Sequence, residues 1–155
     1  MTILDAAWPE ELTLEVVIEV PRGSFVKRGS DGHVEFISPF PCPFNYGSVP
    51  TYLGGEGDLL DAVVLGKRLA FGTRVRVQVR GAVALTDRGM TDDKLICSSD
   101  PISPWDRQRV LRFFRFYARC KWFLNLCRLQ SGRNACDGWC EARAALSRAR
   151  PRSPA

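Results

Sequence analysis

Histidines, long apolar runs and a basic leader are scarce or missing in this chain of 155 residues. The single histidine, His33, has no second histidine to act with, so a histidine-based metal site or catalytic dyad is excluded. No apolar run approaches the roughly 20 residues that span a bilayer, which argues against a membrane protein. The first fifteen residues carry four acids and lack the basic start and apolar stretch of a signal peptide, so we expect a soluble, cytoplasmic protein.

A disulfide framework is also not favoured. Six cysteines are present, but without a secretory signal we interpret them as free thiols. The alternative is a zinc site built from Cys120, Cys127, Cys136 and Cys140. Their spacings match no common zinc pattern, and free cysteine commonly serves as a small buried apolar residue, so the thiol interpretation is preferred.

The composition is that of an ordinary globular protein, but the charge is unevenly distributed. Hydrophobic residues make up 45% and charged residues 25%, which suits one domain over residues 1–150 with a loose tail at 151–155. The net charge is +5, yet residues 1–100 have a balance of −4 and residues 101–155 a balance of +9. The first part is therefore a candidate for cation chemistry, and the second for an acidic or polyanionic partner.

Short strands separated by turns dominate the first hundred residues. The segment 74–80 alternates polar and apolar side chains, which is typical of a strand with one solvent-facing side. The predicted strands are 14–20, 24–28, 62–65, 74–79 and 82–85. Several short strands at this spacing predict a closed or nearly closed barrel of antiparallel character.

Three other segments have a recognisable local pattern. Residues 38–50 contain four prolines among aromatic residues, so we expect an ordered loop that holds Tyr46 over a cleft or in the core. The sequence at 103–106 offers a capping hydroxyl, a proline and an acid, which predicts the start of an amphipathic helix. Residues 131–134 are expected to end it, and 139–149 to form a second, short helix.

Two acidic segments, 56–61 and 87–94, are candidates for metal binding. Mg²⁺ prefers hard oxygen ligands and usually binds through a few carboxylates together with substrate phosphates. Gly89 permits a hairpin that would fold the acids on either side of it inward, whereas Asp58 and Asp61 converge only if the chain turns between them. The alternative, that both segments are solvated turns, remains open at this point.

A series of short motifs follows a fixed order along the chain. These are Ile18–Ser24, Lys27, Asn45–Gly47, Gly57–Asp61, Thr86–Asp87 with Asp92 and Lys94, and Phe113–Phe114 with Tyr117. Their order and spacing resemble the soluble (family I) inorganic pyrophosphatases. The resemblance implies an α+β, mainly β fold, with an OB-like five-stranded β-barrel and flanking C-terminal helices. It also implies magnesium-dependent hydrolysis of pyrophosphate to two phosphates.

The resemblance implies a role for nine side chains. Asp58 matches the carboxylate that takes a proton from the attacking water. The matching metal ligands are Glu56, Asp61, Asp87 and Asp92. The matching phosphate-binding groups are Lys27, Tyr46, Lys94 and Tyr117. These roles are physically consistent, because paired metal ions acidify a bound water and lysines neutralise charge on the departing phosphate.

Several positions depart from the family pattern. Glu56 stands where the family has aspartate, and Leu59 where it has proline. The family tends to have an acid, an arginine, a tyrosine and a lysine at the positions of Gly29, Val34, Cys42 and Ala118. One oxyanion-type donor can be worth roughly 100- to 1,000-fold in rate, so these losses predict weakened turnover with retained metal binding.

Three classes of function fit these observations. The first is a magnesium-dependent pyrophosphatase, with pyrophosphate as substrate. The second is a degenerate relative that keeps the barrel as a metal-binding or assembly subunit. The third, binding of nucleic acid by the barrel and its arginine-rich helix, is the weakest, because the acidic segments repel phosphates unless metals intervene. Prokaryotic relatives are usually homo-oligomers, and we expect the same here.

Overall fold

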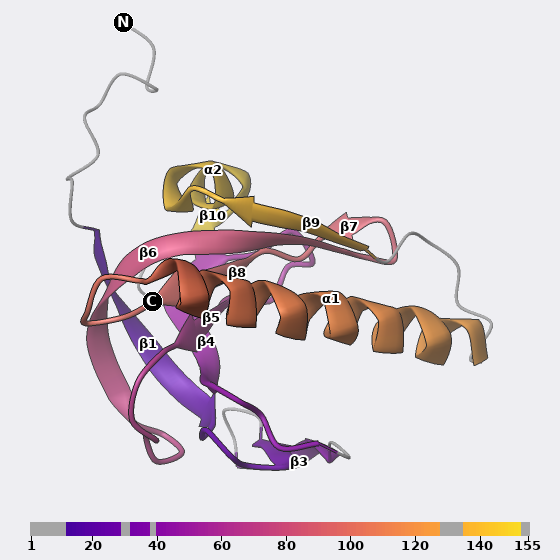
Figure 1. The fold of residues 1–155 in the computed structure, drawn as a ribbon, viewed down its shortest axis with the longest axis horizontal. Coiled ribbons are helices and arrows are strands. Elements are labelled where there is room, and N and C mark those ends of the chain that lie inside the picture. The colour runs from indigo at the N-terminus through magenta and orange to yellow at the C-terminus, as the bar shows by residue number, and fades with distance from the viewer. Residues whose placement is uncertain (1–11, 29–31, 38–39, 128–134, 153–155) are drawn as a thin grey trace, which may run out of the picture.

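The structure, a computed structural model, describes residues 12–28, 32–37, 40–127 and 135–152 (Figure 1). The elements in chain order are β1 (Thr13–Val20), β2 (Val26–Arg28), β3 (Val34–Ile37), β4 (Asn45–Leu53), β5 (Leu59–Val64), β6 (Arg74–Asp87), β7 (Met90–Thr91), β8 (Lys94–Cys97), α1 (Pro104–Cys127), β9 (Ala135–Cys140), α2 (Ala142–Arg148) and β10 (Arg150–Pro151). The assignment of residues 1–150 to one domain stays a prediction.

Five strands close into a barrel. β1 pairs with β4, β4 with β5, β5 with β8, β8 with β6, and β6 pairs back with β1. All of these pairings are antiparallel except β5 with β8, which is parallel. Closure leaves these strands no open edge between them. The predicted fold, an OB-like five-stranded barrel with helices from the C-terminal part of the chain, is confirmed.

Two apolar cores follow from strand alternation. One joins the barrel strands to α2 and includes Leu95, and the other lies between the strands and α1 and includes Ile96. Adjacent residues of β8 thus contribute to different cores, as expected where successive side chains point to opposite faces. Because both faces are covered, all four residues of β8 are buried.

Helix α1 runs along the outside of the barrel (Figure 1). Its start is the predicted capping box: the Asp106 amide donates to Ser103 Oγ at 3.1 Å, and that hydroxyl donates to Asp106 Oδ2 at 3.0 Å. The predicted apolar stripe is also present, since Val110 and Phe114 are buried against the barrel. Neither helix of the described residues is both long and apolar enough to cross a membrane.

The prediction of separate strands at 74–79 and 82–85 is wrong, because both belong to the single strand β6. The pairing of β6 with β8 shifts register between Val79 and Gly81, so the pairing is irregular there but the strand continues. The ring of Trp139 occupies the place of a side chain at residue 81, where an added Cβ would lie 2.4 Å from a ring carbon. In the sequence Gly81 resembles a turn signal, but it is glycine because the distant Trp139 packs against it.

The segment 45–50, expected as a loop, is the first part of β4. Pro50 fits because the pairing of β4 with β5 shifts register between Val49 and Leu53, where a missing amide is tolerated. Trp139, expected in a helix, lies in β9 instead.

The end of the chain also differs from expectation. The second helix begins only at Ala142, and Arg150–Pro151 pairs with β4 as β10. The Arg152 amide continues this contact by donating to the Thr51 carbonyl at 2.8 Å. The expected helix break at 131–134 and residues 153–155 lie outside the described residues.

Candidate active site

A cavity of about 330 Å³ lies beside the barrel strands, at the side reached by the two acidic segments. Eight of the nine predicted site residues line it: Lys27, Tyr46, Glu56, Asp58, Asp61, Asp92, Lys94 and Tyr117. The ninth, Asp87, is 6% exposed and belongs to an acidic cluster with two of these residues. The structure therefore brings together side chains that are up to 90 positions apart in the sequence.

The turn between β4 and β5 carries Glu56 toward the second acidic segment. Gly55, next to it, lies so close to Thr91 that an added Cβ would be 2.7 Å from the Thr91 carbonyl oxygen. A residue with a side chain would push the two segments apart, because the obstructing atom belongs to the backbone. The close approach thus depends on glycine and sets the position of Glu56.

Three carboxylates meet where the two segments come together. Glu56, Asp87 and Asp92 each offer an oxygen, and these oxygens lie within 4.8 Å of one another. The hairpin that returns the chain after Asp87 uses Arg88 and Gly89 at φ values of 50° and 79°, which suits a turn with positive φ at both central residues. The predicted inward folding of these acids around Gly89 is therefore confirmed.

The chemistry of this donor set fits a divalent cation. Three like charges at such short separation repel one another unless a positive charge lies close by. Carboxylate oxygens are the ligands that Mg²⁺ prefers, and a small set of them is its usual protein contribution. Among the described residues, these three acids form the one group of three or more histidine, cysteine or acidic side chains placed closely enough to hold a metal ion.

Lys94, at the start of β8, is the buried cation of the cavity. Its side chain is 3% exposed, and Nζ donates to Asp61 Oδ2 at 2.5 Å and to Asp92 Oδ1 at 2.8 Å. Burial acts to lower the pKa of Lys94, but the neighbouring carboxylates of Asp61 and Asp92 hold it well above its usual value. Lys94 is therefore an ammonium ion at neutral pH.

Asp61 faces Lys94 and lies outside the three-carboxylate cluster. Burial acts to raise the pKa of Asp61, but attraction to Lys94 and hydrogen bonding outweigh it, so the pKa is lowered. Asp61 is thus ionised, as a metal ligand must be, although its contact in the structure is with the lysine. Asp58 is exposed at the rim of the same cavity.

The phosphate-binding candidates lie around Tyr46. The Lys27 and Lys94 ammonium groups are 6.0 and 5.5 Å from the centre of its ring. Burial and the Asp61 charge raise the pKa of Tyr46 well above its usual value, so its hydroxyl keeps its proton. Tyr117 reaches the cavity from α1 and stacks on Phe113 at a centroid distance of 6.3 Å.

Glu19 of β1 also lines the cavity, and it is not among the nine site residues predicted from the sequence. Glu19 is half-buried between the buried Ile18 and Val20, so its side chain lies on the other face of the strand from theirs. Simple alternation along the strand therefore holds here, and the face opposite the apolar core borders the cavity. The sequence offers little signal for this role, because β1 contains a second acid, Glu15.

Three of the positions that depart from the family pattern, Val34, Cys42 and Ala118, supply no group to the cavity, whereas Glu56 and Leu59 line it. Val34 is 49% exposed on β3, and Ala118 is 8% exposed within the core under α1. The Cys42 thiol donates to the Phe44 carbonyl at 3.0 Å. None of these three residues lines the cavity, while Gly29 lies outside the described residues.

The cysteine interpretation is consistent with the described part of the chain. Cys42, Cys97, Cys120, Cys136 and Cys140 are free thiols. Cys120 is exposed on α1, whereas Cys136 and Cys140 are half-buried on β9. The proposed zinc ligands do not form a cluster among the described residues, and the side chain of Cys127 is not among them.

The protein is a closed OB-like barrel in which three carboxylates lie beside a buried lysine. This arrangement is typical of proteins that bind a divalent cation next to an anion. Within that class, residues 16–150 match the family described as inorganic pyrophosphatase, and the chain belongs to this family.

Similarity to individual proteins covers much of the chain. The soluble inorganic pyrophosphatase of Oryza sativa subsp. indica is 33% identical over 123 residues, which cover 66% of this chain and 58% of that protein. The inorganic pyrophosphatase of Streptomyces coelicolor is 32% identical over 126 residues, covering 68% of this chain and 77% of that protein. A crystal structure of an inorganic pyrophosphatase from Neisseria gonorrhoeae has a TM-score of 0.69 at 26% identity, covering 87% of this chain and 86% of that one. The chain thus spans less than two thirds of the rice protein's length.

Proposed function

We propose that this chain hydrolyses inorganic pyrophosphate to two phosphates, with Mg²⁺ as cofactor. The observation that carries the proposal is the meeting of Glu56, Asp87 and Asp92 within 4.8 Å, beside the buried ammonium of Lys94. Membership of the pyrophosphatase family supports it independently.

Glu56, Asp87 and Asp92 would hold the cation, and Asp61 is a further ligand if it exchanges its contact with Lys94. When bound, Mg²⁺ neutralises charge on the phosphates and makes a bound water more acidic. The metal specificity and the number of ions are part of the proposal.

The side chains of the cavity have complementary roles in binding and proton transfer. Lys27 and Lys94 provide positive charge for the phosphate oxygens, and such placed charge is the main contribution of a protein to phosphoryl transfer. Tyr46 keeps its proton because its pKa is raised, so its hydroxyl can donate a hydrogen bond to the substrate. Tyr117, which also lines the cavity, would offer a second hydroxyl. Asp58, accessible at the rim, would accept the proton of the attacking water.

The test is phosphate release from pyrophosphate, measured with Mg²⁺ and with excess EDTA, with p-nitrophenyl phosphate as a control substrate. We expect release from pyrophosphate in Mg²⁺ and its loss on chelation. Release that persists in EDTA, or that favours the control ester, would contradict the proposal.

A second function, a metal-binding or assembly subunit with little turnover, is favoured by the substituted positions. The arginine and lysine that relatives tend to have at the places of Val34 and Ala118 are absent, and neither residue borders the cavity. This alternative predicts a thermal midpoint that rises with Mg²⁺, as any ligand of the folded state produces, without phosphate release.

We also propose a homo-oligomer in the cytoplasm. The exposed arginines of α1 and the exposed Phe116 beside them support an interface on that helix. Sedimentation velocity and cell fractionation would test the two statements separately, and a monomer that sediments with membranes would contradict both.

A further inference from the structure

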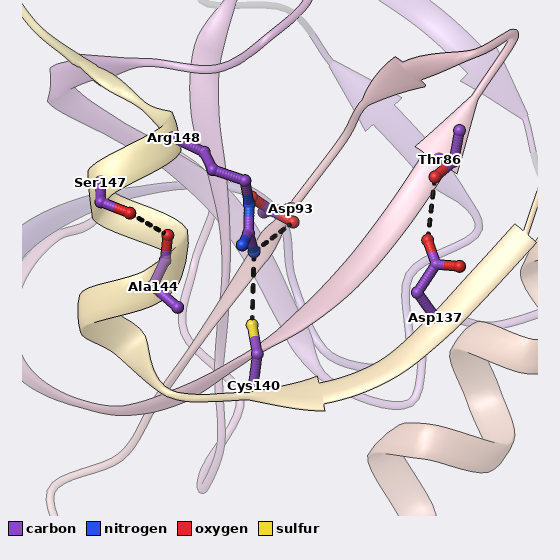
Figure 2. Close-up of polar contacts among 7 residues, drawn as sticks. All are labelled: Thr86, Asp93, Asp137, Cys140, Ala144, Ser147 and Arg148. Carbon is purple, nitrogen blue, oxygen red and sulfur yellow. Dashed lines mark hydrogen bonds and ion pairs between the residues drawn. The ribbon is translucent and has the colours of Figure 1, made fainter.

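Asp93 lies between Asp92 and Lys94 in sequence and borders the same cavity, but the partner of its carboxylate, Arg148, does not line the cavity. Arg148, at the end of α2, donates from Nε to Asp93 Oδ2 at 2.9 Å and from Nη2 to Oδ1 at 3.2 Å (Figure 2). The Asp93 side chain is 4% exposed and that of Arg148 is 40% exposed. Such a two-point contact fixes the orientation of a carboxylate as well as its position.

Arg148 is itself held in place. Its Nη2 also donates to Cys140 Sγ at 3.5 Å, as Figure 2 shows. Helix α2 is anchored before Arg148 by the buried Ala145 and Leu146, and after it by the pairing of β10 with β4. The guanidinium therefore projects from a well-supported helix and is not a freely moving surface group.

The contact with Arg148 gives Asp93 a cationic partner of its own, so the adjacent acids Asp92 and Asp93 have different partners. Asp92 faces Lys94 and the other cluster carboxylates, while Asp93 is turned toward α2. Without Arg148, a buried carboxylate would lose its partner only one residue from the cluster, which is strongly unfavourable. A backbone movement that let the Asp93 carboxylate reach solvent or another partner would also displace the adjacent Asp92.

We propose that Arg148 is a positioning residue for the cation site: by holding Asp93 it fixes the segment 92–94 so that Asp92 faces Glu56 and Asp87. This inference rests on the proposed Mg²⁺ site. Arg148 does not line the cavity, so its effect passes through Asp93.

The experiment is calorimetric titration of Mg²⁺ into the full chain and its variants. Arg148→Ala should weaken Mg²⁺ binding by roughly 10- to 100-fold, the usual effect of removing a partner that orients a metal ligand. Arg148→Lys keeps the charge without the two-point contact and should lose less. Arg150→Ala, which removes an exposed arginine two residues away, is the matched control and should bind Mg²⁺ as the wild type does.

A double substitution separates positioning from helix docking. Asp93→Asn combined with Arg148→Ala removes the stranded charge, so it should bind Mg²⁺ more tightly than Arg148→Ala alone. If Arg148→Ala fails to fold, Arg148→Lys and Asp93→Asn provide the comparison instead.

The two possible failures are distinguishable. If the wild type binds Mg²⁺ and Arg148→Ala has the same affinity with only a lowered thermal midpoint, Arg148 merely docks α2 and the inference is overturned. If the wild type itself does not bind Mg²⁺, the proposed function fails and this inference fails with it. Weakened binding in Arg148→Ala, with partial recovery in the double variant, supports the inference.

Discussion

Strand β8 carries one lysine and one cysteine, and helix α1 carries several basic side chains and two cysteines, but the environments of the two elements differ. Lys94 of β8 is 3% exposed with carboxylates at 2.5 and 2.8 Å, whereas Arg109 of α1 is 43% exposed and 3.8 Å from Asp106. Cys97 of β8 is buried and Cys120 of α1 is exposed. The helix accounts for much of the positive charge, yet one buried lysine has the strong electrostatic contacts. The strength of an electrostatic contact therefore depends on burial and on the distance to the partner charge, and the net charge of a segment does not predict it.

The largest effect should come from Lys94→Ala. Removing a buried partner costs roughly 3–5 kcal/mol, and we expect the lower end of this range because Asp61 is 23% exposed and partly solvated. Phosphate release should also fall by roughly 100- to 1,000-fold, the cost of one placed donor. Urea unfolding and a phosphate assay measure the two effects. Arg115→Ala on α1 should change stability by less than about 0.5 kcal/mol, and equal losses in the two variants would remove the contrast between β8 and α1.

Asp58→Asn should separate chemistry from stability within the cavity. Asp58 is exposed, so its neutral isostere should leave the free energy of unfolding unchanged. Loss of a proton acceptor should lower phosphate release by roughly 10²- to 10⁴-fold. Steady-state kinetics together with urea unfolding provide the measurement. Full activity in this variant would assign proton transfer to another group.

Gly55→Ala should have a smaller, indirect effect. The added Cβ would meet the Thr91 carbonyl oxygen at 2.7 Å, so the turn must move and take Glu56 with it. We expect Mg²⁺ binding to weaken by roughly tenfold, the lower end of effects from the supporting structure around a metal. Gly54→Ala is the matched control, since its added Cβ meets no atom closer than 3.7 Å. Similar affinities in the two variants would show that the close approach at Gly55 does not position the acid.

The smallest effect should be a difference in alkylation rate between the cysteines of β8 and α1. Burial raises the pKa of Cys97 to about 12. Burial also raises the pKa of the Cys42 thiol. Because the thiolate is the reactive form and its fraction grows only as the pH approaches the pKa, Cys97 should resist alkylation from pH 7 to pH 9. Peptide mass spectrometry after iodoacetamide treatment should find Cys120 modified first and Cys97 only after unfolding. Equal rates in the native protein would count against the buried position of β8.

Local patterns in the sequence predicted the elements that rely on local interactions. The capping box at Ser103 and Asp106 marked the start of α1, and the period of its apolar residues gave the buried stripe. Gly89 marked the hairpin that brings Asp87 close to Asp92. The identities of the site residues came from the order of motifs, because spacing alone left solvated turns as an alternative.

The errors arose where distant residues decide the outcome. Gly81 resembles a turn but continues β6, because Trp139 packs against it. Glu19 lies on the half-buried face of β1, and only the arrangement of the surrounding segments makes that face part of the cavity wall. The bond between Arg148 and Asp93 joins residues 55 positions apart, and nothing in either local segment indicates it. Strand pairing and side-chain packing between distant residues are the features that are hardest to predict from a single sequence.

The most direct test of the central claim is anomalous diffraction from crystals of the full chain grown with Mn²⁺, which accepts the same oxygen ligands as Mg²⁺. A peak bounded by the carboxylates of Glu56, Asp87 and Asp92 is the predicted result. If Mn²⁺ at saturating concentration gives no peak between these three side chains, they do not form a cation site, and the proposed phosphate chemistry loses its basis.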